Sequence, residues 1–171
     1  NNHNGMFDRK GCVWFAAAVR APGNPAFCKK GSDHPSARVF PLERTSRHLS
    51  VLDPTTMKYT FVDTCFGTHH LQFDANDVLW TSGGGQVVGW LDMAGFDRTG
   101  DAAKAQGWTP FVLDTNGNGR RDEYVEPDQP VDPTKDKRLT AALYGIGINP
   151  VDNTVWGSVL TFPGYVIRVN P

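Results

Sequence analysis

The chain has 171 residues, which is typical of about one domain, and its 18 glycines and 12 prolines predict many turns. Its 17 basic and 18 acidic residues leave a formal net charge of −1, which argues against nucleic acid as a partner. The longest apolar run, Cys12 to Val19, is far shorter than the roughly 20 residues that cross a bilayer, so we expect no membrane span.

The segments that follow in chain order predict a mostly β chain. Helical periodicity is confined to Asp101–Gln106, which predicts one short helix. The other segments are rich in β-branched and aromatic residues and are separated by Gly, Pro and Asn turn signals. The expected strands lie within residues 3–14, 48–54, 59–63, 69–80, 86–92, 108–114, 144–156 and 164–171. The insertion from Ala21 to Ser46 predicts a long loop over one face.

Three segments of the chain align with one another. His3–Trp14 and His69–Trp80 both place a His four residues before a Phe, follow the Phe with Asp and a turn, and reach Trp seven residues after the Phe. Tyr144–Trp156 is a looser third copy, one residue longer in the turn and without the His. The first two copies each continue with a second pair of strands. The third continues with one strand and ends before its outer strand.

A repeated unit of four short antiparallel strands is the pattern of a β-propeller blade. We therefore predict an all-β fold, a β-propeller with two full blades at approximately residues 1–66 and 67–140 and most of a third at 141–171. Because a ring needs about 4–8 blades, we expect the segment to be a fragment of a larger ring. The alternative is a self-contained β-sandwich of about ten strands. In the propeller, the repeated Trp14, Trp80 and Trp156 would form core between blades.

The aligned units, in which His precedes Phe-Asp, a turn and Val-Trp or Leu-Trp, resemble the repeats of streptogramin (virginiamycin B) lyase-like propellers. Three further runs look like a bacterial group of such propellers that carries a carboxypeptidase-regulatory-like domain: residues 24–28 with 32–37, 64–71 and 125–133. The resemblance covers nearly the whole chain. In these lyases a divalent metal and a His-based proton abstraction open a cyclic peptide ester by elimination, but no complete catalytic set of that family is matched here.

The segment Asp114–Asp122 has the spacing of a calcium-binding loop, with oxygen side chains at positions 1, 3, 5 and 9 and Gly at position 6. The candidate metal residues are Asp114, Asn116, Asn118, Arg120 (through its carbonyl) and Asp122. The loop is not an EF-hand, because Val125 stands at position 12 and strand-like residues precede it; Glu123 or Glu126 could complete the shell. Two Asn-Gly pairs would equally form a hairpin turn without an ion.

His3 and His69 are the candidate catalytic residues. The innermost strand of each propeller blade lines the central channel, so equivalent positions converge. Two imidazoles there could hold a second divalent metal, or one could act as general base while the other polarises the substrate. The alternative is that each donates to a carbonyl of the neighbouring blade without any chemistry. His70 is expected to point to the other side of the strand.

The three cysteines, Cys12, Cys28 and Cys65, are too widely spaced for a zinc knuckle. One disulfide plus one buried thiol is compatible with their positions. Cys28 and Cys65 lie at loop edges beside the first blade, whereas Cys12 lies in an apolar strand and is expected in the core.

These features predict an extracytoplasmic, periplasmic or secreted, propeller segment that binds a small molecule or peptide near its central channel. A metal-assisted lyase or hydrolase at the same site and a structural interaction module are the alternatives. A metal held by His3 and His69 would favour the enzyme, whereas an apolar channel would favour binding. The remaining blades would come from a longer chain or from an assembly.

Overall fold

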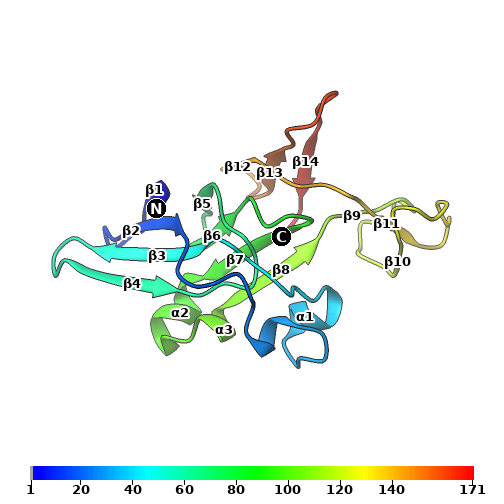
Figure 1. Ribbon diagram of the computed structural model, residues 1–171. Helices are drawn as coiled ribbons and strands as arrows, with labels where there is room; N and C mark the ends of the chain where they lie inside the picture. The colour runs from blue at the N-terminus through cyan, green and yellow to red at the C-terminus, as the bar shows by residue number, and fades with distance from the viewer. Residues whose placement is uncertain (1) are drawn as a thin grey trace.

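A computed structural model describes residues 2–171, and its strands form three antiparallel sheets and one small mixed sheet (Figure 1). The first sheet consists of β1 (Asn2–Phe7), β2 (Val13–Ala17), β3 (His48–Asp53) and β4 (Lys58–Val62). The second consists of β5 (Leu71–Phe73), β6 (Val78–Thr81), β7 (Val87–Asp92) and β8 (Gln106–Pro110), and the third of β12 (Gly145–Ile148), β13 (Val155–Ser158) and β14 (Val166–Val169). In each of the three, neighbours in sequence are neighbours in the sheet.

A side sheet, which the sequence did not predict as a separate unit, extends away from the other three (Figure 1). It contains β9 (Val112–Leu113), β10 (Tyr124–Val125) and β11 (Asp136–Arg138), in the order β10-β11-β9 with β10 and β11 parallel. The candidate calcium loop connects β9 to β10.

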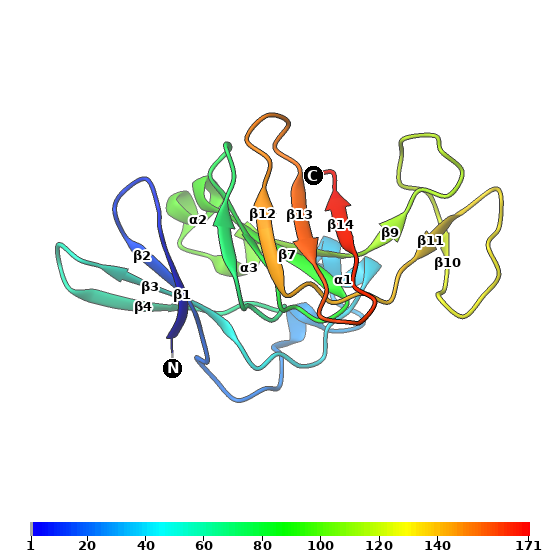
Figure 2. The ribbon, with the colours of Figure 1, turned by 90° about the horizontal axis from the view of Figure 1, so that it is seen from above.

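The prediction of a mostly β chain is confirmed. The three antiparallel sheets are neighbours, and they contact one another through the first strand of each. Strand β1 lies beside β5, and β5 lies beside β12 (Figure 2). No closed ring is present among residues 2–171.

The repeated Asp and Trp of the alignment are joined by hydrogen bonds. The Asp8 carboxylate accepts from the backbone N–H of Lys10 and Cys12 and from the indole N–H of Trp14, each at 2.9 Å. In the second sheet, the carboxylate of Asp74 accepts the same three kinds of bond, again at 2.9 Å, from Asn76, Val78 and Trp80. In the first two units, the turn between the first two strands is therefore fixed by one carboxylate, which satisfies amides that the ladder leaves free.

Two apolar clusters lie between the sheets. The first joins the first and second sheets and contains Trp14, Leu49, Val62, Leu71, Leu79 and Leu91. The second joins the second and third sheets and contains Trp80, Val88, Phe111, Leu143 and Val155. Trp14 and Trp80 are buried, as expected, but the prediction was wrong for Trp156, which is 41% exposed because no further sheet packs on it.

Short helices cover one edge of the second sheet. The predicted helix is present as α3 (Ala102–Ala105), capped by the side chain of Asp101, but α2 (Met93–Thr99) directly before it was not predicted. The insertion of residues 21–46 contains the 3-10 turn η1 (Ala26–Cys28) and α1 (Pro35–Val39). No helix among the described residues has the length and apolar character needed to cross a membrane.

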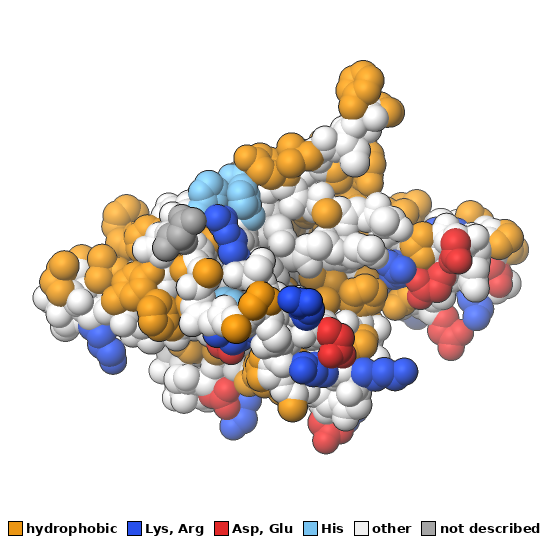
Figure 3. All heavy atoms as spheres, viewed as in Figure 1, with side chains coloured by type: hydrophobic (Ala, Val, Ile, Leu, Met, Phe, Trp, Pro, Cys, Tyr) orange, Lys and Arg blue, Asp and Glu red, His pale blue; other side chains and the backbone are white. Residues whose placement is uncertain are grey.

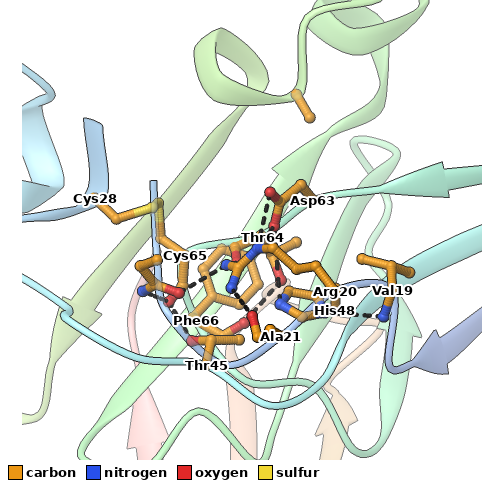
Figure 4. Close-up of polar contacts among 12 residues, drawn as sticks. Val19, Arg20, Ala21, Cys28, Thr45, His48, Asp63, Thr64, Cys65 and Phe66 are labelled. Atoms are coloured by element: carbon orange, nitrogen blue, oxygen red, sulfur yellow. Dashed lines mark hydrogen bonds and ion pairs between the residues drawn. A yellow bond between two sulfur atoms is a disulfide. The ribbon is translucent and has the colours of Figure 1, made fainter. Parts of the chain in front are cut away.

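A disulfide between Cys28 and Cys65 fastens the insertion to the end of the first sheet (Figure 4). The hydroxyl of Thr45 donates to the Cys65 carbonyl at 2.5 Å, which adds a second link from the same insertion. Cys12 is free and only half-buried, because it lies in the turn before β2 and not inside the strand.

Beside the disulfide, the guanidinium of Arg20 binds both carboxylate oxygens of Asp63 at 2.9 and 3.0 Å (Figure 4). The fully buried His48 accepts a bond at Nδ1 from the backbone N–H of Val19, and its Nε2 lies 3.8 Å from Asp63 with no hydrogen-bond partner. Burial, followed by the positive charge of Arg20, lowers the pKa of His48 to about 4. The ring is therefore neutral at pH 7.

Candidate functional site

Equivalent positions of the three aligned units meet in space. His3 lies in β1, His69 lies just before β5, and Tyr144 lies just before β12, at the place where the third copy lacks the His. The rings of His3 and His69 have centroids 4.4 Å apart, and those of His69 and Tyr144 are 4.9 Å apart. The structure thus brings the two candidate histidines together and adds Tyr144 to the same row.

His70 belongs to the same cluster. Its ring centroid lies 4.4 Å from that of His69 and 5.4 Å from that of His3, so the expectation that it points to the other side of the strand was wrong. The physical reason is that residues 69 and 70 lie in a bend before β5, where the alternation of a strand does not apply. Figure 3 shows a group of histidine side chains together on one part of the surface.

Ser82 and Gly83, at the end of β6, hold this bend in place. The backbone N–H of His69 donates to the Ser82 carbonyl, and the Ser82 N–H donates back to the carbonyl of His70. The Ser82 hydroxyl donates to the Tyr144 carbonyl at 2.5 Å, which links the second and third sheets. Gly83 has φ of +83°, and a Cβ there would lie 2.6 Å from the His69 Cβ, so a larger residue would displace the imidazole.

Asn4 fixes His3 relative to the second sheet. The pairing of β1 with β2 shifts register between His3 and Met6, and Asn4 adopts a left-handed conformation with φ of 49°. Its side-chain oxygen accepts a bond of 2.6 Å from the backbone N–H of Leu71 in β5. Asn tolerates this conformation better than most residues, so the irregularity links β1 to β5.

The environment of the histidines is basic. Burial lowers the pKa of His69, and the neighbouring His70, His3 and Arg47 lower it further by repelling a positive charge. Two nitrogen atoms at the cluster, His3 Nε2 and Arg47 Nη1, are buried and have no hydrogen-bond partner among the described residues. An anionic oxygen would accept a bond from Arg47 Nη1, and a metal ion would bind a lone pair on His3 Nε2.

A hollow of about 320 Å³ begins beside the cluster. Tyr144 lines it together with Leu143, Val159, Leu160 and Tyr165. Its size lies at the lower end of the range for small-molecule pockets, and its lining is largely apolar. The histidines and this hollow together provide polar groups next to an apolar surface.

A second hollow lies between the second and third sheets and is lined by Val78, Trp80, Trp90 and Val169 among others. It contains none of the histidines. We favour the histidine cluster as the functional site because it combines three imidazoles with unpartnered buried nitrogens, whereas this hollow is mainly an apolar gap between sheets.

The structure folds the candidate calcium residues into one tight loop. The Asp114 carboxylate accepts from the backbone N–H of Gly117 at 2.6 Å and Gly119 at 2.8 Å. The side-chain amides of Asn116 and Asn118 donate to Asp122 at 2.8 and 2.6 Å, and these bonds hold the pKa of Asp122 below its ordinary value. Arg120 donates its backbone N–H to the Asn118 side chain and is exposed.

The expected completion of this loop by a glutamate is not seen. Glu123 pairs with Lys135 at 3.1 Å, and Glu126 pairs with Arg138 at 2.6 Å. The loop instead lies against Asp136 of β11, which is 1% exposed; its Oδ2 accepts from the Asp122 N–H at 2.8 Å and its Oδ1 has no partner. Sequence spacing gave no signal for Asp136, because it lies beyond the loop and reaches it only through the pairing of β11 with β9 and β10.

Comparisons with family models, with curated proteins and with solved structures return no match. The function is therefore inferred from the residues and their geometry alone.

Proposed function

We propose that the three antiparallel sheets are consecutive blades of a β-propeller with streptogramin lyase-like repeats. Two observations support this. Their first strands lie next to one another in sequence order, and the equivalent residues His3, His69 and Tyr144 form one row. In a propeller both features follow from blades arranged around an axis that the innermost strands line.

The proposal includes further blades, from a longer chain or from an assembly. Large apolar side chains are exposed on the first sheet, such as Phe7 and Phe61, and on the third, such as Trp156 and Val166. Trp156 occupies the position in the third sheet that corresponds to Trp14 in the first and Trp80 in the second. Those two residues are covered by the next sheet, whereas Trp156 is not. Native mass spectrometry tests this proposal on the purified protein: we expect an assembly or a longer polypeptide, and a folded monomer of 18.8 kDa would contradict it.

We propose that the protein binds a small molecule or peptide with an anionic group at the His3–His69–Tyr144 row. The observation that carries this proposal is the convergence of equivalent positions from three units on one partly exposed cluster. Arg47 and the imidazoles would face the anionic group, and the hollow beside Tyr144 would take the apolar part of the ligand. The alternative is a reaction at the same place, either the lyase reaction that the resemblance implies or a hydrolysis. It would require a metal or a base among these residues.

Calorimetric titration tests the binding proposal. The probes are short acetylated peptides with a free carboxylate, each compared with its C-terminal amide, in buffer containing a chelator. We expect the carboxylate form of at least one peptide to bind about tenfold or more tightly than the amide, and His3→Ala or Arg47→Ala to remove the difference. Equal or absent binding of both forms across the panel would favour the structural interaction module.

We also propose calcium binding at Asp114, Asn116, Asn118 and Asp122. Carboxylate and amide oxygens are the ligands that Ca²⁺ prefers, and this loop gathers two side chains of each kind. Asp136 supplies an additional unpartnered carboxylate oxygen next to Asp122. The ion would fix the loop between β9 and β10 and so order the side sheet.

We propose an extracytoplasmic location, periplasmic or secreted. The disulfide between Cys28 and Cys65 supports it, because such bonds form and persist mainly in oxidising compartments. The exposed apolar residues of the first and third sheets would then be covered by other blades in that compartment.

A further inference from the structure

Three histidines at the His3–His69–Tyr144 row have ring nitrogens close enough together to bind one metal ion. One ring nitrogen from each of His3, His69 and His70 lies within 4.8 Å of the other two. Among residues 2–171, this is the one group of three or more His, Cys, Asp and Glu residues with such spacing. The nitrogens of a tetrahedral zinc site are about 3.3 Å apart, given metal–nitrogen bonds of about 2.0–2.1 Å, so small ring rotations would bring all three to a shared ion.

His70 Nδ1 has two polar neighbours in the cluster, the Tyr144 carbonyl and His69 Nδ1, the latter at 3.1 Å. His70 Nδ1 lies 2.7 Å from the Tyr144 carbonyl, and because a carbonyl only accepts, this nitrogen carries the proton. His70 Nε2 therefore keeps its lone pair for a ligand. A bond from the second nitrogen of a ring to a backbone carbonyl is the usual arrangement for metal-binding histidines, since it fixes the tautomer and the ring orientation.

His3 gives an independent observation. Its Nε2 is buried and has no hydrogen-bond partner, a state that a native structure normally avoids. The ring centroids of His69 and His70 lie 4.4 and 5.4 Å from that of His3. A shared cation would give His3 Nε2 a partner.

We propose that His3, His69 and His70 form a binding site for a divalent transition metal of the zinc class, with a fourth position open to water or to an anionic ligand. Neutral imidazoles suit Zn²⁺, Co²⁺, Ni²⁺ and Cu²⁺, whereas Mg²⁺ and Ca²⁺ prefer oxygen ligands. Three protein ligands with one open position are typical of catalytic zinc sites, in which the metal acts as a Lewis acid or activates water. The inference deepens the binding function proposed above, because Arg47 would lie beside an anion at the open position.

Competition with a chromophoric chelator measures the site, with Zn²⁺ as the probe and Mg²⁺ as the comparison. We expect one Zn²⁺ per chain, and at least about a 100-fold loss of zinc affinity in each of His3→Ala, His69→Ala and His70→Ala. Co²⁺ should give the visible absorption of a four-coordinate site in the unaltered protein and lose it in the three variants.

Two variants serve as controls. His34→Gln removes a histidine that stacks on Trp108 and does not belong to the cluster, and Cys12→Ser removes the free thiol. Both should bind zinc as the unaltered protein does. Circular dichroism shows whether each variant is folded, and the milder substitutions His3→Gln and His69→Gln replace any alanine variant that is not.

Zinc bound equally well by the unaltered protein and the folded cluster variants, or no binding of Zn²⁺ beyond that of Mg²⁺, would overturn the proposal. The result is distinguishable from failure of the binding function, because the peptide titration is done both with a chelator and with one Zn²⁺ per chain, and only the second series depends on the metal. Zinc binding without any peptide binding would leave the metal site standing and remove the peptide function.

Discussion

The carboxylate of Asp74 accepts a 2.9 Å hydrogen bond from the indole N–H of Trp80 and, in the same turn, bonds from two backbone amides. Asp8 and Trp14 repeat this arrangement in the first sheet. In the third unit the turn residue is Asn149, and the indole of Trp156 donates to Thr154 instead. One carboxylate therefore fixes both the turn and the buried Trp in two of the three units.

We predict that Asp74→Ala destabilises the protein by about 3 kcal/mol, because it leaves the Trp80 indole and buried backbone amides without acceptors. Urea unfolding measures the loss. Asn149→Ala is the matched control, since Asn149 occupies the same turn position but does not bond the Trp; its cost should stay below about 1 kcal/mol. Equal costs for the two variants would show that the carboxylate–indole bond is not what stabilises the turn.

We predict that stability falls as the pH decreases from 6.5 to 4, with His48 as a main cause. The pKa of His48 is about 4 in the folded chain and its ordinary value is 6.5, so between these pH values the unfolded chain binds the additional proton. The stabilisation is complete above pH 6.5 and is lost below it. Unfolding free energies at pH 7 and pH 5 should differ by about 2 kcal/mol from this group.

His48→Gln isolates that contribution, because the Gln side chain does not titrate. His69, whose pKa is also lowered, remains in both proteins and cancels in the comparison. If the variant loses as much stability between pH 7 and pH 5 as the unaltered protein, His48 is not buried and neutral as described.

We predict that removal of the disulfide costs about 4 kcal/mol, the amount expected for a bond that joins residues 37 positions apart. The change is Cys28→Ser together with Cys65→Ser, followed by urea unfolding. Cys12→Ser, which alters the half-buried free thiol, should change stability much less. A double variant as stable as the single one would mean that the insertion is held by its hydrogen bonds alone.

We predict that calcium binds the loop between β9 and β10 with a dissociation constant of about 10⁻⁴ to 10⁻³ M, the range of sites with few carboxylates. Isothermal titration should detect it, and Asp122→Ala should abolish it. Asp132→Ala is the control, because Asp132 forms a similar turn by accepting bonds from Thr134 and lies outside the proposed shell. Binding that survives Asp122→Ala would place the ion elsewhere.

Much of the fold could be predicted from local patterns. The Phe-Asp turns and the following Trp located the first two strands of the first two units, because the same carboxylate bonds recur there. Helix α2 was missed because Met93–Thr99 contains a Gly and no clear apolar periodicity; its stability comes from packing of Met93 and Phe96 into the core between the sheets. The side sheet depends on a parallel pairing of two short strands, which leaves no periodic signal.

The site was predictable only in part. Alignment of the repeats identified His3 and His69, since equivalent positions of repeated units meet. His70 and Tyr144 were missed for different reasons: the bend at residues 69–70 depends on the hydrogen bonds to Ser82, and Tyr144 carries no residue-type similarity to His. Asp136 is brought to the calcium loop by strand pairing alone.

A crystal structure of the protein tests the central claim most directly, namely that equivalent positions of successive units converge to form the ligand site. We predict that β1, β5 and β12 lie next to one another and that His3, His69 and His70 face one shared, solvent-accessible space, as in the present arrangement. Imidazoles of His3 and His69 on different sides of the sheets, or too far apart to contact one small ligand, would contradict it.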